Sequence, residues 1–126
     1  MSNSAIQTSN APAAIGPYSQ GIQAGSTLYI SGQLPIDPTT GNFARNDVAS
    51  QTRQSLTNIR NILNQAGADM SHIVKTTVML ANIEDFSAMN EVYSQFFSAP
   101  YPARAAYQVA CLPKNALVEI ECIAVK

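Results

Sequence analysis

The segment that most restricts the fold is residues 73–80, where every side chain except Lys75 is β-branched or apolar. A run that is apolar on both faces predicts a strand in the interior of a sheet, covered on both sides. Such a strand needs neighbouring strands to pair with it and other layers to pack on it. The chain must therefore build a sheet with further elements against its faces.

Four other segments predict the remaining strands of this sheet. Residues 19–24 and 27–34 alternate apolar and polar side chains around a Gly-Ser pair suited to a tight turn, which predicts a hairpin. Residues 104–110 and 117–125 show β-type patterns near the C-terminus. The sheet is thus expected to have at least five strands.

Two helices separate these strands. The first is expected between Asp47, an N-cap residue, and Gly67, which suits a left-handed C-terminal cap. The second is expected after the N-cap Asn82, with apolar and aromatic side chains along one face as far as Phe97, and it ends before Pro100. The order strand, strand, helix, strand, helix, strand, strand predicts an α+β fold with both helices on one sheet face.

The length of 126 residues fits one domain over residues 1–126. Turn-forming residues fill 35–46 and predict a long connection. Residues 1–14 are mainly small and polar with little apolar periodicity, so we expect a loose N-terminal arm before the fold begins near Tyr18.

Charge and hydropathy limit the partners. Charged residues are 12% of the chain, about half of the ~25% usual in soluble domains, which predicts apolar surface that self-association would cover. The seven lysines and arginines are spread along the chain against eight acids, which predicts no basic patch and no nucleic acid as primary partner. No apolar run approaches the ~20 residues of a membrane span, so no membrane partner is expected.

The N-terminal region, which resembles no targeting signal, and the cysteine usage predict a cytoplasmic protein. The first basic residue is Arg45, so the N-terminal region resembles neither a signal peptide nor a transit peptide. Cys111 and Cys122 are expected to be reduced thiols. With His72 as the single histidine and no glycine-rich phosphate loop or serine-hydrolase elbow, the sequence predicts a site without metal or cofactor.

Arg104 is the most informative candidate for such a site. It begins an uncharged strand and has no carboxylate nearby in the sequence, and its planar donors match a carboxylate group. A small carboxylic acid is therefore the expected ligand. The alternative is an arginine at the rim of the fold, paired with an acid from another segment or subunit.

Other candidates also allow two interpretations. Asn90 lies on the apolar stripe of the second helix. It is either a ligand contact or a buried amide that bonds within the fold. Glu119 and Glu121 share one sheet face. They are either acids exposed to solvent or a general base and its neighbour in a cleft between subunits. The first hairpin region offers small or hydroxyl-bearing groups that a ligand could approach, although ordinary strand and turn composition by itself explains them: Tyr18, Ser31 and Gly32.

Four motifs occur in a specific order along the chain. The segment Pro-Ala-Arg-Ala-Ala-Tyr-Gln-Val-Ala-Cys-Leu-Pro-Lys at 102–114 is followed by Val-Glu-Ile-Glu at 118–121. Together with residues 16–20, 30–33 and 86–97, this segment resembles the sequence blocks of the RidA family, also known as the YjgF family, so the similarity covers nearly the whole chain. The resemblance implies a chorismate-mutase-like α+β fold, a mixed sheet covered by two helices, and a homotrimer with sites between subunits.

The resemblance also implies a cofactor-free enamine/imine deaminase. Its substrates would be 2-iminobutanoate, 2-iminopropanoate and precursors such as 2-aminoacrylate, and its products 2-keto acids and ammonia. Arg104 would bind the substrate carboxylate and Glu119 would lie near the attacking water. The pocket would be completed by Tyr18, Ser31, Gly32, Asn90 and Ala106. Ala106 is a departure, since many relatives have cysteine there.

Two other functions are weighed against deamination. The same cleft in a non-catalytic trimer would bind a small carboxylate as a regulatory or interaction module. A ribonuclease or translation inhibitor would also fit the family, but the acidic balance and the lone histidine argue against it here. Release of ammonia from freshly formed 2-aminoacrylate separates catalysis from binding.

Overall fold

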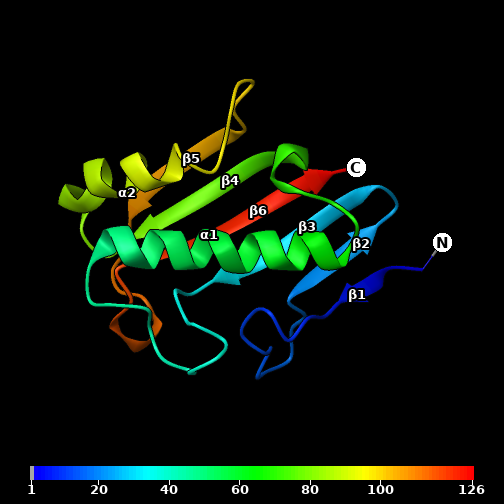
Figure 1. The fold of residues 1–126 in the computed structure, drawn as a ribbon, viewed down its shortest axis with the longest axis horizontal. Helices are drawn as coiled ribbons and strands as arrows, with labels where there is room; N and C mark the ends of the chain where they lie inside the picture. The colour runs from blue at the N-terminus through cyan, green and yellow to red at the C-terminus, as the bar shows by residue number, and fades with distance from the viewer. Residues whose placement is uncertain (1) are drawn as a thin grey trace.

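The computed structural model describes residues 2–126 and contains one six-stranded sheet (Figure 1). The strands lie side by side in the order β1-β2-β3-β6-β4-β5, and all neighbours are antiparallel except the parallel pair β4 and β5. β4 therefore lies inside the sheet, as its sequence predicts. The bounds are β1 Ser4–Ile6, β2 Gly21–Ala24, β3 Thr27–Gln33, β4 Ile73–Leu80, β5 Ala103–Gln108 and β6 Val118–Val125.

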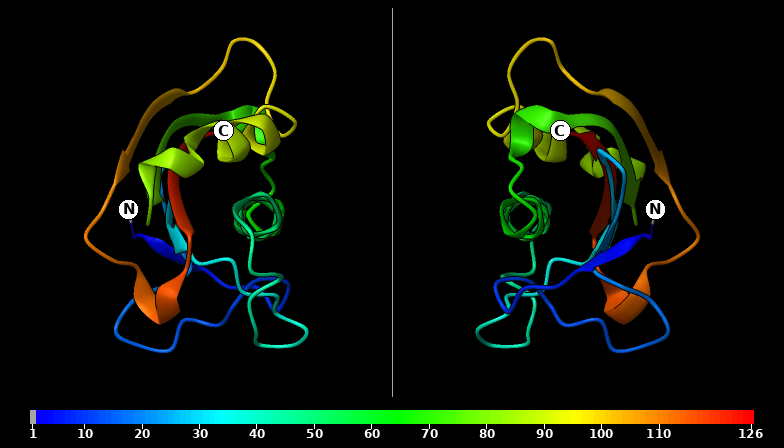
Figure 2. Two further views of the ribbon diagram at one scale, coloured as in Figure 1. Left: turned by 90° about the vertical axis from the view of Figure 1, so that its left-hand side faces the viewer. Right: turned by 90° about the vertical axis from the view of Figure 1, so that its right-hand side faces the viewer.

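Both helices, α1 (Val48–Gln65) and α2 (Phe86–Tyr93), pack on the same face of the sheet, since side chains of both belong to one core. The end-on views show α1 lying along one side of the sheet (Figure 2). The α+β prediction of a mixed sheet with two helices is confirmed. α2 is shorter than predicted, because beyond Tyr93 the backbone bonds tighten to three-residue turns. Three short 3₁₀ segments complete the fold: η1 Met70–His72, η2 Ile83–Asp85 and η3 Pro113–Asn115.

The hydrophobic core lies between the helices and one face of the sheet. Leu56 and Ile59 of α1 pack there with Val78 of β4 and Ile120 of β6, and all four are fully buried. The opposite face of the sheet has no helix on it, and Thr77 of β4 is only half-buried. The prediction that β4 is covered on both sides is therefore wrong for a single chain. Its second face carries Lys75, Thr77 and Met79, side chains that tolerate partial exposure.

The N-terminal segment is not a loose arm, contrary to the prediction. β1 pairs with β2 as an edge strand of the sheet. The buried Gln20 amide accepts a hydrogen bond from Thr8 N at 2.8 Å and donates to Thr8 O and Pro12 O at 3.0 and 2.8 Å. These contacts are backbone pairings and the long-range hydrogen bonds of one side-chain amide, which side-chain periodicity does not reveal.

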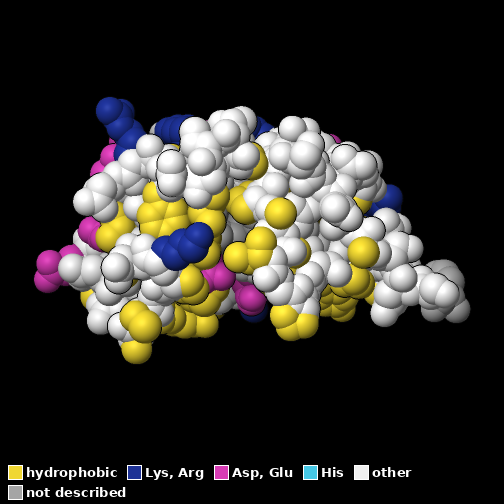
Figure 3. Space-filling view, turned by 90° about the horizontal axis from the view of Figure 1, so that it is seen from below, with side chains coloured by type: hydrophobic (Ala, Val, Ile, Leu, Met, Phe, Trp, Pro, Cys, Tyr) yellow, Lys and Arg dark blue, Asp and Glu magenta, His cyan; other side chains and the backbone are white. Residues whose placement is uncertain are grey.

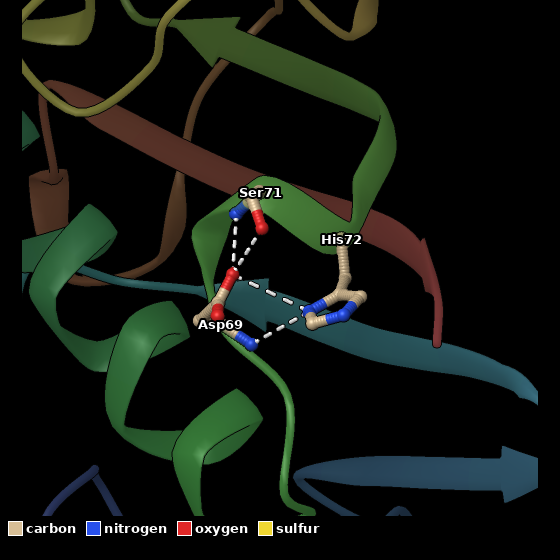
Figure 4. A network of polar contacts seen from close by, with 3 residues as sticks. All are labelled: Asp69, Ser71 and His72. Carbon is tan, nitrogen blue, oxygen red and sulfur yellow. Dashed lines mark hydrogen bonds and ion pairs between the residues drawn. The ribbon is translucent and has the colours of Figure 1, made fainter.

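Side-chain caps place the connections around α1 and β4. Asp47 accepts a hydrogen bond from Ser50 N at 2.7 Å, which confirms it as the N-cap of α1. Before β4, Asp69 accepts hydrogen bonds from the amide and hydroxyl of Ser71, and His72 Nδ1 accepts from Asp69 N at 3.1 Å (Figure 4). His72 thus closes a capping box at η1.

Candidate active site

Arg104 lies in β5 with its guanidinium against α2. Its Nη1 donates a hydrogen bond to Asn90 Oδ1 at 2.6 Å. Its Cζ lies 5.3 Å from the centroid of the Phe86 ring and 4.8 Å from that of Tyr93, within the range of cation–π attraction. We call these four residues the Arg104 cluster. The α2 side chains at helical spacing hold the guanidinium in one place.

No carboxylate neutralises Arg104 within residues 2–126. The one ion pair of this region joins His72 and Asp69, 3.3 Å apart. Within the same region, Asn90 is the one side chain that accepts a hydrogen bond from the guanidinium. The other donors of the exposed guanidinium are thus available to a ligand carboxylate.

Tyr93 anchors this cluster to the sheet. Its hydroxyl and Thr76 Oγ1 of β4 share a hydrogen bond of 2.7 Å, and both residues are buried. Its ring centroid lies 4.5 Å from that of Phe97. Burial raises the pKa of the Tyr93 phenol, partly offset by the Thr76 bond, so Tyr93 is neutral at physiological pH. Tyr93 therefore links the position of Arg104 to the centre of the sheet.

We expect Tyr93→Phe to lower the free energy of unfolding by about 1–3 kcal/mol, because the buried Thr76 hydroxyl loses its partner. Urea unfolding at fixed protein concentration measures the loss. Adding Thr76→Val removes the unpaired hydroxyl, so the double variant should recover most of it. If Thr76→Val lowers the free energy of unfolding as much in the Tyr93→Phe variant as it does in the wild-type protein, the two groups are not coupled.

Glu119 lies in β6 on the face without helices. Its neighbours in the strand, Val118 and Ile120, are in the core, so alternation directs Glu119 the other way. Its carboxylate lies directly beside Gly32, where an added Cβ would overlap Oε2. Burial, and secondarily the charge of Glu121, raises the pKa of Glu119. A half-buried carboxylate with a raised pKa is suited to proton transfer.

Gly32→Ala is expected to displace the Glu119 carboxylate, because a methyl group would occupy its position. The carboxylate is the end of a flexible side chain, so stability should change little. If Glu119 acts on the substrate, turnover should fall by about 10²-fold, typical of a displacement near 1 Å. Steady-state kinetics measure the effect, and unchanged kinetics would show that the position of this carboxylate does not matter.

The other predicted residues are distributed over both faces. Ser31 Oγ donates to Ser19 O at 2.5 Å and borders a hollow of 340 Å³ on the open face, which Glu121 also lines. Tyr18 borders a different hollow, of 630 Å³, between the N-terminal segment and the connection before α1. Ala106, two residues beyond Arg104, lies against the core on the helix side.

Arg104 and Glu119 lie on opposite faces of the sheet. Arg104 is in register with Thr76, which points toward α2, whereas Glu119 pairs with Met79 on the face without helices. Two strand spacings and three residue steps put their backbones roughly 10 Å apart in each direction. A single chain therefore does not place both around one small substrate.

Sequence patterns single out only one of the residues that support Arg104, namely Asn90. They place Phe86 and Tyr93 beside it only as an apolar stripe at helical spacing, and they give no sign that Thr76 bonds to Tyr93. That Arg104 meets this stripe depends on the parallel pairing of β5 with β4.

Two absences hold for the described part of the chain. Among residues 2–126, no group of three or more histidine, cysteine, aspartate or glutamate side chains is arranged to hold a metal ion. No helix in this range has the length and apolar character needed to cross a membrane.

Comparison with known proteins identifies the family. The family model described as Endoribonuclease L-PSP matches residues 8–126, and the chain belongs to this family. The resemblance to RidA proteins is confirmed by a crystal structure from Yersinia pestis, described as a protein of unknown function of the conserved Rid protein family. That structure has a TM-score of 0.96 and 50% identity, and the match covers 99% of this chain and all of the other.

Two further matches carry more specific names. The 2-iminobutanoate/2-iminopropanoate deaminase of Capra hircus is 56% identical over 121 residues, which are 96% of this chain and 88% of the relative. A crystal structure described as E. coli TdcF with bound serine has a TM-score of 0.94 and 47% identity, and the match covers 98% of each chain.

Proposed function

We propose that this protein is a cofactor-free deaminase that hydrolyses 2-imino acids and their enamine precursors to 2-keto acids and ammonia. Relatives named for this activity are 50–56% identical over 96% of the chain, which supports the assignment. The observation that carries it is Arg104, a guanidinium held by α2 with no carboxylate partner within residues 2–126. A small carboxylate is its natural ligand.

The reaction needs orientation of substrate, a water molecule and a group that moves protons. An enamine such as 2-aminoacrylate first tautomerises to the imine by moving a proton from nitrogen to the terminal carbon. Arg104 binds the carboxylate, and Glu119 accepts a proton from the water whose oxygen forms a bond to the imine carbon. Glu119 then passes that proton to the imine nitrogen, which completes the carbinolamine. Transfer of the carbinolamine hydroxyl proton to the nitrogen accompanies cleavage of the carbon–nitrogen bond, so the nitrogen leaves as ammonia, the carbon becomes a ketone and Glu119 is again a carboxylate.

The serine-bound TdcF structure supports a small amino-acid-like ligand. Serine has the α-carboxylate and α-nitrogen that a 2-imino acid also has. Tyr18, Ser31, Gly32, Asn90 and Ala106 complete the proposed pocket, Asn90 by holding the guanidinium and Gly32 by leaving room for Glu119.

The site is assembled between protomers of a homotrimer. Arg104 and Glu119 are on opposite faces of one chain, so Arg104 of one copy must meet Glu119 of the next. The surface supports association, because the sheet face without helices exposes Tyr29, and hydrophobic side chains gather on the side seen from below (Figure 3). The segment before β2 contributes Ile15, which is 84% exposed.

The trimer is tested by light scattering at micromolar concentration. We expect a mass three times that of the chain, because the open sheet face needs a partner surface to cover it. Deaminase activity should disappear on dilution into monomers. A monomer that retains full activity would contradict both the assembly and the shared site.

Deamination is tested by generating 2-aminoacrylate or 2-iminobutanoate in the assay, with a pyridoxal-phosphate enzyme acting on different amino acids. The protein should accelerate release of 2-keto acid and ammonia over the spontaneous reaction. Comparison of amino acids identifies the preferred imine. Saturable binding of a carboxylate without acceleration would instead favour a non-catalytic regulatory or interaction trimer.

Cysteine chemistry supports a cytoplasmic location for this activity. Both cysteines are free, and Cys111 is exposed, which suits a reducing compartment. The proposed partners are the small imino and keto acids and further copies of the chain.

A further inference from the structure

Two arginines of α1 converge on a single aromatic ring outside the Arg104 cluster. The Cζ atoms of Arg53 and Arg60 lie 6.0 and 5.4 Å from the centroid of the Phe96 ring, just after α2. The two arginines are seven residues apart, or about two helical turns, so they share one side of α1. Arg53 Nη2 donates to Gln95 Oε1 at 2.9 Å, which fixes one of the two guanidinium groups.

This charge is not balanced locally. α1 contains no aspartate or glutamate, and its only charged side chains are these two arginines. Within residues 2–126, neither arginine has a carboxylate within ion-pair distance. Both arginines line one hollow and neither has a counterion there, so an anion bound in it would offset their positive charge.

The two guanidiniums border a hollow of 290 Å³. Its lining has no acid: Arg53, Thr57, Arg60, Met70, Gln95 and Phe96. The adjoining hollow includes Arg45 and Arg53, so three of the seven basic residues lie along one side of α1. These three arginines are spread over 16 positions of the sequence, but helical spacing and the loop before α1 bring them to adjoining hollows.

We propose that this hollow, the Arg53–Arg60 site, binds a phosphoryl dianion, either inorganic phosphate or a phosphate monoester. Two guanidinium groups supply two positive charges and several N–H donors, which match a doubly charged group with three terminal oxygens. A single carboxylate would leave one arginine without a counterion. The site shares no residue with the Arg104 cluster, so its ligand and the imino acid bind at different places.

Isothermal titration calorimetry with inorganic phosphate and with phenyl phosphate, at constant ionic strength, tests the proposal. Wild-type protein should bind one of them saturably. Arg53→Gln and Arg60→Gln should each weaken binding about tenfold or more, since each removes charge-assisted hydrogen bonds. Lys114→Gln, which removes a positive charge elsewhere, should bind normally. Saturation by inorganic phosphate identifies the free anion as sufficient, and saturation by phenyl phosphate alone identifies a monoester.

The active site provides a second control. Arg104→Lys, and wild-type protein saturated with pyruvate, should bind the phosphoryl ligand unchanged. Loss of binding in either case would place the anion at Arg104 and overturn the proposal. Absence of saturable binding, or equal binding by both glutamine variants and wild type, would also overturn it. Circular dichroism of each variant checks that the fold is intact.

Discussion

Replacing Glu119 with glutamine is expected to lower turnover by about 10²- to 10⁴-fold, the effect typical of a lost general base. Glutamine preserves the size of the side chain and its place beside Gly32, but it cannot accept a proton from water. Binding of pyruvate should survive, because the carboxylate contact is made by Arg104. Steady-state kinetics and a pyruvate titration measure the two effects separately.

Glu121→Gln is the matched control. Glu121 lies on the same sheet face, two residues along β6, and is more exposed than Glu119. Its glutamine variant should retain near-normal ammonia release at neutral pH. If both variants behave alike and both stay active, both acids are solvated strand residues and Glu119 does not act on water.

The pH dependence gives a further signature of Glu119. Its pKa is raised, and a base acts only when deprotonated, so kcat/KM should increase as the pH rises through that pKa. Glu121 contributes to the raised pKa of Glu119, because its negative charge disfavours a second negative charge nearby. In Glu121→Gln the pKa of Glu119 should fall, and the rising limb of the profile should move to lower pH. A limb that does not move would mean that another group controls it.

Replacing Arg104 with alanine is expected to abolish most deaminase activity, mainly through loss of substrate binding. A charged hydrogen-bonded contact contributes about 1.5–3 kcal/mol, equivalent to a loss of affinity of roughly 10- to 150-fold. Misorientation of the imine adds to this, so kcat/KM should fall further than affinity. Calorimetry with pyruvate and steady-state kinetics measure both quantities.

Arg104→Lys separates charge from geometry. Lysine keeps the positive charge but loses the planar pair of donors, and it stacks less well against Phe86 and Tyr93. We expect a trimer of normal stability with most of its activity lost, though less severely than in Arg104→Ala. Unchanged turnover in either variant would make Arg104 a rim residue with no role in catalysis.

Local patterns predicted most of the secondary structure. The strand at Ile73–Leu80 and the N-cap Asp47 were correct, because β-branched runs and side-chain caps act within a few residues. The strand Ser4–Ile6 was missed, because it is held by backbone pairing with β2 and by the distant Gln20 amide. α2 was predicted too long, because aromatic side chains continue past the point where the helical backbone ends.

The sequence by itself determined the order of the helices and strands from Gly21 onward, the family, and the individual residues on which the proposed chemistry depends. Only the tertiary structure decided which of these residues share a surface. Alternation along a strand divides its side chains between two faces, but the face that the helices cover depends on long-range packing. Insertion of β6 between β3 and β4, and parallel pairing of β5 with β4, put Arg104 and Glu119 on opposite faces. The same packing of α1 against the end of α2 brings Arg53 and Arg60 to one ring.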